Sequence, residues 1–264
     1  MIICNIVGGM GNQLFQIFAT ISYALTYSQP FGFFSNTGSR STYWDTFLRN
    51  LITYINLKPL PCSVFTENMI NMNRPPVYSN ICMTGYYQSE KFFKEHYETI
   101  CRIIGIEEEQ SSIAYKYSRD YSKYVSMHFR LGDYLKLPEY YLILDFEYYR
   151  KSLEEILSRD SEIHTVLYFC EESDEIEVIK QLSNIFPNIL FERETKTDVD
   201  WEQFFIMSLC KHNIIANSTF SWWAAYFNKN PSKIVCAPER WYAEKLEHIS
   251  IDELVPKEWV RIKN

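Results

Sequence analysis

The sequence predicts an α/β fold built on parallel sheets, and two stretches of the chain lead to that prediction. The chain opens with an apolar run over residues 2–7, a glycine-rich turn over residues 8–13, and a helical pattern from about residue 14 to residue 27. A strand, a glycine-rich turn and a helix in this order begin a Rossmann-like unit. From residue 124 onward, strand and helix patterns alternate, which favours a parallel sheet covered on both faces.

A polar and charged segment, residues 107–123, separates these two stretches and is the expected connection between domains. We therefore expect an N-terminal domain over residues 1–123 and a C-terminal domain over residues 124–264. Within the first domain, we expect an irregular region over residues 29–82, because four prolines interrupt it, and a helix over residues 89–104.

The helix expected near residues 14–27 contains no charged residue, so we expect protein to cover both of its faces. The second domain alternates regularly. Its expected strands cover residues 124–129, 164–170, 188–191, 213–216 and 233–236, and its expected helices cover residues 146–158, 174–185, 201–211 and 220–228.

Composition narrows the class of protein. The chain has 264 residues, of which 47% are hydrophobic and 22% are charged, so it has enough apolar mass for a core. Its 26 Lys and Arg against 33 Asp and Glu give a net charge of −7, which argues against binding to nucleic acid. A nucleotide ligand remains compatible with this charge, because it needs only one or two local cations.

The cysteines, the N-terminus and the apolar runs of the sequence indicate the cellular compartment of the protein. The seven cysteines show no CxxC spacing, so they predict reduced thiols and no zinc site. The N-terminus has no basic region and no cleavage site of a signal peptide, and the chain contains no run of about 20 apolar residues. We expect a cytoplasmic protein, with loose association with the inner face of the membrane left open. The sequence does not decide the oligomeric state.

The glycine-rich turn is the first candidate site. Gly9 and Gly11 follow the first strand, but Leu14 stands at the third glycine position of a dinucleotide motif, and no acidic residue occurs before Asp45. A nicotinamide cofactor is therefore not expected. The alternatives are a turn whose backbone amides and Asn12 side chain face a ligand at a helix N-terminus, or a plain connection between strand and helix.

The second candidate is the segment from His128 to Tyr134, with the sequence His-Phe-Arg-Leu-Gly-Asp-Tyr. It ends an expected strand, and ligands bind at the carboxyl ends of strands in open α/β sheets. The planar fork of Arg130 suits phosphate oxygens. His128 lies two residues away and is expected on the same face of the strand.

The third candidate begins at Asn217, after an expected strand. Ser218 or Thr219 can cap the helix that follows, and its remaining backbone amides can hold an anion. Two acidic pairs leave their roles open. Asp198 and Asp200 either stabilise the start of a helix, which we favour, or bind a divalent metal as a D-x-D motif.

The other acidic pair, Glu171 and Glu172, ends a strand at the same expected edge. It either accepts hydrogen bonds from guanine or ribose, or is simply solvated.

Taken together, these segments resemble the bacterial α-1,2-fucosyltransferases of glycosyltransferase family 11. The resemblance runs from residue 1 to about residue 242. It rests on the segments Gly8–Gln16, Gly85–Phe93, His128–Tyr134, Asn217–Ala225 and Ala237–Trp241.

The resemblance implies a GT-B-like fold, with two Rossmann-like domains facing a cleft. It implies transfer of L-fucose from GDP-β-L-fucose to the 2-hydroxyl of a β-galactoside, with inversion and without a metal or other cofactor. The acceptor would be a galactose-containing oligosaccharide or a lipid-linked glycan.

The resemblance also assigns roles to residues. Arg130 would grip the donor diphosphate, and Asn12 would lie near the leaving oxygen and the sugar. The N-terminal domain would lie on the acceptor side, and the C-terminal domain would bind the GDP-sugar. As the base for the acceptor hydroxyl we expect Asp133, with His128 in reserve. The residues expected to bind substrate are Gly9, Met10, Gly11, Gln13, Glu171, Asn217, Ser218, Thr219 and Ser221.

Leu131 departs from the family pattern, which usually has a second arginine there. If that arginine supports Arg130, its loss lowers activity; if it binds donor, the chain is weak or inactive. Two rival functions therefore stay open: a non-catalytic protein that binds a GDP-sugar or a glycan, and a transferase that uses another GDP-deoxysugar.

Overall fold

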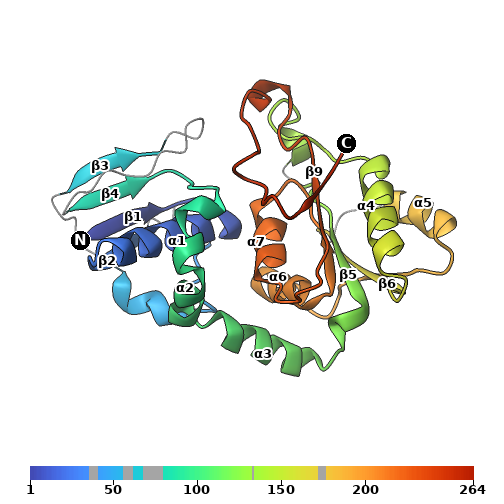
Figure 1. The fold of residues 1–264 in the computed structure, drawn as a ribbon, viewed down its shortest axis with the longest axis horizontal. Helices are drawn as coiled ribbons and strands as arrows, with labels where there is room; N and C mark the ends of the chain where they lie inside the picture. Colours follow the sequence, from blue (N-terminus) through green and yellow to red (C-terminus); the bar gives the residue numbers. More distant parts are fainter. Residues whose placement is uncertain (36–40, 56–61, 68–79, 133, 172–176) are drawn as a thin grey trace. The chain divides into compact units, whose positions relative to one another are not determined.

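The computed structural model describes residues 1–35, 41–55, 62–67, 80–132, 134–171 and 177–264. Two of the residues singled out above, Asp133 and Glu172, lie outside these ranges. The chain divides into two compact units, Met1–Glu109 and Gln110–Asn264, and each contains a parallel sheet (Figure 1). The predicted α/β class with two Rossmann-like units is confirmed.

The sheet of the first unit has the strand order β2-β1-β4-β3, and each neighbouring pair is parallel. Its strands are β1 (Ile2–Ile6), β2 (Phe31–Ser35), β3 (Ser63–Thr66) and β4 (Ile81–Thr84). Three of them lie in the region predicted to be irregular, so that prediction was wrong. Strands of four or five residues carry little pattern of their own, and pairing with β1 supplies the hydrogen bonds that hold them.

Helix α1 spans Met10–Thr26 and is buried along nearly its whole length, which confirms that both of its faces are covered. It begins four residues earlier than predicted. Gly9 is extended at the N-cap position. The backbone amide of Gln13 donates to the Gly9 carbonyl at 3.0 Å, which closes the first helical turn. Gly11 and Asn12 therefore belong to the helix rather than to the turn before it.

The helix predicted over residues 89–104 is divided in three. Two short 3-10 turns, η2 (Glu90–Phe92) and η3 (Lys94–His96), precede α2 (Tyr97–Ile104). Gly105 ends α2 in the left-handed conformation, with φ of 89°, as glycine does at helix ends. Among the other 3-10 turns described are η1 (Arg49–Tyr54) in this unit and η4 (Tyr121–Lys123), η5 (Tyr134–Lys136) and η6 (Glu244–Leu246) in the second.

The sheet of the second unit has the order β10-β9-β8-β5-β6-β7, with parallel pairs throughout. This is the doubly wound order, in which the direction of winding reverses between β5 and β8. Its strands are β5 (Tyr124–His128), β6 (Thr165–Phe169), β7 (Leu190–Arg193), β8 (His212–Ile214), β9 (Val235–Pro238) and β10 (Val260–Ile262).

Helices cover both faces of this sheet, as predicted. In Figure 1, α6 and α7 lie on one side of it and α4 and α5 on the other. The bounds are α4 (Phe146–Arg159), α5 (Glu177–Ile185), α6 (Asp200–Leu209) and α7 (Thr219–Phe227). The apolar core on the α4 side includes Val125, Met127, Leu153 and Val166, all with fully buried side chains.

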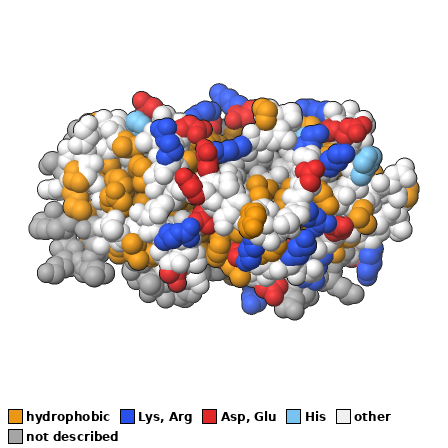
Figure 2. All heavy atoms as spheres, turned by 90° about the horizontal axis from the view of Figure 1, so that it is seen from below, with side chains coloured by type: hydrophobic (Ala, Val, Ile, Leu, Met, Phe, Trp, Pro, Cys, Tyr) orange, Lys and Arg blue, Asp and Glu red, His pale blue; other side chains and the backbone are white. Residues whose placement is uncertain are grey.

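The segment expected to connect the domains contains helix α3 (Ile106–Tyr117). Its end is tied to α6, because Lys116 and Tyr117 both bind the Glu202 carboxylate. On the face in Figure 2, Lys and Arg side chains lie among Asp and Glu side chains. None of the described helices is long and apolar enough to cross a membrane.

Candidate functional site

The reversal between β5 and β8 brings two of the predicted segments to one edge of the second sheet. Arg130 follows β5 directly, and the segment from Asn217 to Ser221 follows β8 and opens α7. In open parallel sheets, the loops diverge at the carboxyl ends of the strands where the order reverses, and ligands bind in the crevice there. Arg130 therefore stands where open parallel sheets of this order bind ligands.

The guanidinium of Arg130 pairs with a carboxylate from the neighbouring strand. Its Nη1 lies 3.2 Å from Glu171 Oε1, and the two side chains are 27% and 47% exposed. Glu171 stands just after β6, the second strand of this Rossmann order, where a carboxylate commonly accepts from a ribose hydroxyl. Arg130 and Glu171 thus place a phosphate-binding group and a ribose-binding group side by side.

Because Gly132 has no side chain, the Glu171 carboxylate can lie against the backbone at this position. A Cβ atom at position 132 would lie 2.3 Å from Glu171 Oε2, which is closer than any real contact. The backbone of Glu171 is held as well, because Arg193 at the end of β7 donates to its carbonyl at 2.9 Å. The contact of Arg193 with Glu171 could not be predicted from the sequence, because Arg193 stands in the run Leu-Phe-Glu-Arg simply as the last residue of a strand.

Tyr134 is a second residue that sequence analysis left without a role. Its ring lies under Arg130, with 5.4 Å from the guanidinium carbon to the ring centroid, and it stacks on Tyr141 at 4.2 Å. Its hydroxyl donates to the Asn217 carbonyl at 2.9 Å. Tyr134 therefore ties the Arg130 loop to the start of α7.

The side chains of Asn217, Ser218 and Ser221, at the start of α7, form hydrogen bonds within the protein. The Asn217 amide donates to the carbonyls of Leu142 and Trp241 at 2.9 and 2.8 Å. Ser218 is the N-cap and accepts from the Phe220 amide, and the buried Ser221 hydroxyl bonds to backbone carbonyls. These contacts fix the helix start, and Thr219 in its first turn is half-buried.

His128 is buried, with 7% of its surface exposed, and its ring packs against Phe220 at a centroid distance of 5.4 Å. Its Nδ1 atom is buried and has no hydrogen-bond partner among the described residues. Burial, together with the charge of Arg130, lowers the pKa of His128 to about 3. The imidazole is therefore neutral near pH 7, and its low pKa makes it a poor proton acceptor.

The carboxyl edge of the first sheet carries the glycine-rich segment. Gly8 adopts the left-handed conformation, with φ of 87°, whereas Gly9 is extended and has open space on its Cβ side. Gln13 is 2% exposed, and its side-chain amide donates to the carbonyls of Gly8 and Ser41 at 2.9 and 2.8 Å. Gln16 donates to the Val7 carbonyl at 2.7 Å and accepts from the Val7 amide at 3.0 Å. Gln13 and Gln16 thus hold the turn in place.

Asn12, in contrast, is half-buried and reaches a loop far away in the sequence. Its Oδ1 accepts from Gln88 Nε2 at 2.8 Å. This pairing could not be predicted from the sequence, because the two partners are 76 residues apart. Met10 and Gly11 are buried in the first turn of α1, so only their backbone could meet a ligand.

Asp198 and Asp200 lie at the start of α6. Asp200 is in the first helical turn and its carboxylate accepts from the Trp201 amide at 2.7 Å, while Val199 is the N-cap. Carboxylates are favourable there because of the helix dipole. The described residues contain no group of three or more His, Cys, Asp or Glu side chains placed to hold a metal ion.

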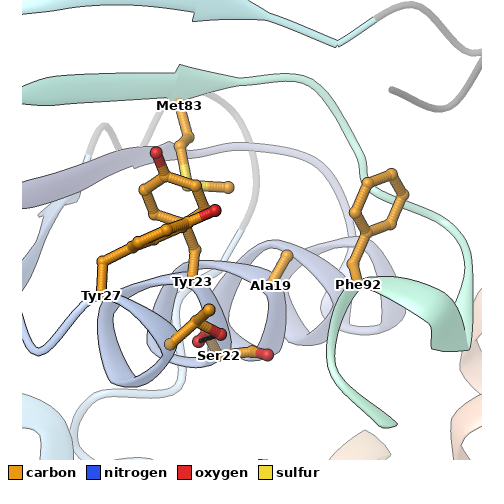
Figure 3. Close-up of a pocket in the computed structure, with 7 residues that line it drawn as sticks. Ala19, Ser22, Tyr23, Tyr27, Met83 and Phe92 are labelled. Atoms are coloured by element: carbon orange, nitrogen blue, oxygen red, sulfur yellow. Dashed lines mark hydrogen bonds between the residues drawn. The ribbon is translucent and has the colours of Figure 1, made fainter. Parts of the chain in front are cut away.

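A pocket in the first unit lies apart from the Asn12 edge. Figure 3 shows Tyr23 of α1 beside Tyr27, the C-cap residue of this helix, near Met83 of β4; the two tyrosine ring centroids are 4.8 Å apart. Its lining consists of Ala19, Ser22, Tyr23, Thr26, Tyr27, Met83 and Phe92. At 1.5 Å per residue, the α1 residues of this pocket lie roughly 10 to 22 Å along the helix from Asn12. The pocket is therefore not part of that edge.

Comparison with known proteins identifies the family. The model of the family described as glycosyl transferase family 11 matches residues 63–263, which include the Arg130 and Asn217 segments. The chain belongs to glycosyl transferase family 11. It is accordingly a glycosyltransferase by family, and the resemblance seen in the sequence is confirmed at that level.

Two relatives of this family 11 chain come from Escherichia coli. One is the O-antigen biosynthesis glycosyltransferase WbnK, 29% identical over 211 residues, which are 75% of this chain and 67% of that protein. The other is an alpha-1,2-colitosyltransferase, 31% identical over 188 residues, 68% of this chain and 61% of that protein. The chain thus spans about two thirds of their length.

The fold has a solved counterpart. A mutant of Arabidopsis thaliana FUT1 in complex with GDP superposes with a TM-score of 0.51 at 9% identity, covering 88% of this chain and 69% of that one. At this identity the likeness concerns the fold, which is the GT-B type with two Rossmann-like domains.

Proposed function

We propose that this family 11 chain transfers L-fucose from GDP-β-L-fucose to the 2-hydroxyl of a β-galactoside, with inversion at the anomeric carbon. The bond from that carbon to the diphosphate oxygen breaks, and a bond to the acceptor oxygen forms on the opposite face. GDP leaves with the electron pair, and the acceptor proton passes to a base. The transition state resembles an oxocarbenium ion, with negative charge growing on the departing phosphate.

The observation that carries this proposal is the position of Arg130. It stands at the carboxyl end of β5, where the sheet order reverses, on the same edge as the N-terminus of α7. A guanidinium and a helix N-terminus both stabilise phosphate charge, and they do so more as that charge grows in the transition state. Glu171, beside Arg130, would accept from the ribose of the same nucleotide.

The glycine-rich segment keeps in this proposal the roles that the resemblance implies. The amide of Asn12 would lie near the leaving oxygen and the sugar, and the extended backbone at Gly9 with the first turn at Met10 and Gly11 would allow close approach. The open space at the Cβ side of Gly9 supports this role. Gln13 is buried, so its contribution would be to hold this turn rather than to touch substrate.

Asp133 is our proposed base for the acceptor hydroxyl, and it follows Gly132 in the Arg130 loop. His128 is the reserve candidate. Its pKa of about 3 lies far below neutral pH, whereas the pKa of an efficient general base lies near the pH of the reaction. We therefore propose that Asp133 accepts the proton.

We propose that transfer needs no metal. The placement of Asp200 in the first turn of α6 supports this, because the helix dipole accounts for the carboxylate without an ion. Full activity in EDTA is the expected result. Loss of activity in EDTA that Mn²⁺ restores would instead make Asp198 and Asp200 a metal site.

For the acceptor, we propose a galactose-containing glycan, free or linked to a lipid carrier. One relative is named as an enzyme of O-antigen biosynthesis, which supports a lipid-linked glycan at the inner face of the membrane. A synthetic β-galactoside and a lipid-linked acceptor, compared by the yield of fucosylated product, test this point.

A transferase for another deoxysugar is the second candidate. A relative 31% identical is named a colitosyltransferase, so membership of this family is compatible with a sugar other than fucose. A non-catalytic GDP-sugar binder is the third candidate, and it rests on Leu131, which stands where the family pattern has a second arginine.

One experiment separates these candidates. The protein is incubated with a β-galactoside and, in turn, GDP-fucose and other GDP-deoxysugars, and released GDP is measured with the mass of the product. We expect GDP release and a fucosylated product with GDP-fucose. Turnover only with another donor supports the second candidate, and GDP binding without release supports the third.

A further inference from the structure

We propose that Gln88 is a positioning residue that holds the Asn12 side chain and couples the orientation of the Asn12 amide to that of its own amide. This inference rests on the proposed function, in which Asn12 lies beside the leaving oxygen. Asn12 has a donor end, Nδ2, and an acceptor end, Oδ1, of nearly the same shape. Only the donor end can stabilise the negative charge that grows on a leaving oxygen.

The hydrogen bond from Gln88 links the orientations of the two amides. Gln88 Nε2 donates to Asn12 Oδ1 at 2.8 Å, so in the structure the acceptor end of Asn12 faces Gln88. If the Asn12 amide turned over alone, two NH₂ groups would meet and the hydrogen bond would be lost, so the Gln88 amide would have to turn over with it. The donor end lies beside Gly8 instead, since a Cβ atom built there would be 3.0 Å from Nδ2. The lack of a side chain at Gly8 therefore leaves room for this orientation.

The loop that carries Gln88 is held in an unfavourable backbone conformation. Tyr87 has φ of 53° although it is not glycine, and Gly85 has φ of 134°. The Glu67 carboxylate accepts from the Tyr87 amide at 2.6 Å, and a Cβ atom at Gly85 would lie 2.5 Å from Glu67 Cβ. Burial raises the pKa of the Glu67 carboxyl. A buried carboxylate and a left-handed residue together hold the backbone next to Gln88, and strain of this kind gathers at functional sites.

Replacement of Gln88 by glutamate is the direct test. A carboxylate of the same length can only accept, so Asn12 turns its nitrogen toward position 88 and presents oxygen to the sugar. We expect kcat to fall at least about tenfold, the equivalent of one lost hydrogen bond, with the KM for donor changed much less. The near-isosteric Gln88→Met variant removes the donor without adding charge, and we expect a smaller fall in kcat. A Gln88→Met variant with the kcat of the wild type would overturn the proposal.

A double-mutant cycle separates positioning from a general structural effect. If Gln88 acts through Asn12, then Gln88→Glu has no further effect on kcat in the Asn12→Ala background. Effects that multiply would overturn the proposal, because Gln88 would then act independently of Asn12. Thermal midpoints of all variants show whether they are folded.

A readout without turnover keeps this inference separate from the proposed function. With asparagine labelled by ¹⁵N, we expect the Asn12 side-chain amide resonances to shift in Gln88→Glu, because Nδ2 gains a carboxylate partner. Resonances like those of the wild type would overturn the inference. If the wild type fails to use GDP-fucose, the proposed function fails, while the amide spectrum still decides the role of Gln88.

Discussion

The carboxyl edges of the two sheets use different chemistry. The edge of the second unit carries charged side chains that meet at one place: Arg130, Glu171 and Arg193. The edge of the first unit carries neutral amides, those of Asn12, Gln13, Gln16 and Gln88, and its Glu67 carboxyl is buried and bonded to the Tyr87 amide. Charged forks suit phosphate oxygens, whereas neutral amides can donate to and accept from sugar oxygens. The contrast supports our proposal that Arg130 binds the diphosphate of the donor and that Asn12 acts at its sugar.

The two edges are also held in place differently. Around Arg130 the support comes from an aromatic ring and from backbone carbonyls of neighbouring loops. Around Asn12 it comes from the buried side chains of Gln13, Gln16 and Glu67, which bond to the backbone near residues with positive φ. Substitutions at the charged edge should therefore change function with little effect on folding, while those at the neutral edge should separate into some that affect folding and some that affect function.

The largest effect is expected at the charged edge. Replacement of Arg130 by alanine should lower kcat/KM by roughly 10²–10³, because a preorganised partner of the leaving phosphate is lost. The thermal midpoint should change little, since the pair with Glu171 is partly exposed.

Arg150→Ala is the matched control. Arg150 on α4 is 26% exposed, close to the 27% of Arg130, and it also pairs with carboxylates, those of Glu147 and Glu154. We expect it to keep full activity. Equal losses in the two variants, or near-normal turnover in Arg130→Ala, would mean that the charged edge does not bind the donor.

The buried imidazole at this edge predicts a dependence of stability on pH. The pKa of His128 is about 3 in the folded protein, below its ordinary value of 6.5. Between these values the unfolded chain binds a proton that the folded chain does not, so stability decreases as pH falls below about 6.5. The limiting slope is about 1.4 kcal/mol per pH unit.

His128→Phe should remove this slope, because the ring can still pack against Phe220. Denaturant unfolding of both proteins at pH 7, 6 and 5 measures the difference. If the difference between wild type and variant stays constant over this range, His128 is not the buried neutral group that the structure shows.

Two adjacent glycines test the neutral edge. Gly8→Ala should destabilise the protein by about 1–2 kcal/mol, because its φ of 87° disfavours a side chain and the new Cβ would meet Asn12. Gly9→Ala should fold like the wild type, since its Cβ would have no neighbour within 4 Å.

Any loss of turnover in Gly9→Ala would then report contact with substrate rather than damage to the fold. Thermal unfolding and steady-state kinetics of the two variants supply both measurements. A Gly9→Ala variant that is stable and fully active would show that ligand does not approach this turn.

The smallest effect is expected at Gly132. The new methyl group of Gly132→Ala would push the Glu171 carboxylate away, which is easy because that side chain ends in solvent. We expect stability to change by less than about 1 kcal/mol, as for most surface substitutions, and the KM for donor to rise a few-fold through loss of one hydrogen bond. Glu171→Gln should raise KM in the same direction. An increase in Glu171→Gln but not in Gly132→Ala would show that the carboxylate can keep its place beside an alanine.

The second unit was largely predictable from the sequence, and the first was not. Most strands and helices from Tyr124 to Pro238 bury apolar side chains of their own, so their periods show in the sequence. Strands β2, β3 and β4 are short and depend on pairing with neighbours, and β10 has only three residues. Their existence depends on contacts that no local pattern records.

The candidate site divides in the same way. Arg130 and Asn12 stand in short motifs and could be found from the sequence. Their supports could not, because Gln88 is 76 residues from Asn12, and Tyr134 is 83 residues from the carbonyl of Asn217. The roles of the motif residues themselves stay predictions until they are tested.

We propose that the charged edge binds the nucleotide and that the neutral edge acts on the transferred sugar. Calorimetric titration of GDP into the wild type, Arg130→Ala and Asn12→Ala separates these roles, because GDP carries the diphosphate but not the fucose. We predict that Arg130→Ala loses GDP binding, while Asn12→Ala binds GDP like the wild type and loses only turnover. GDP binding that survives in Arg130→Ala, or that disappears in Asn12→Ala, would contradict the claim.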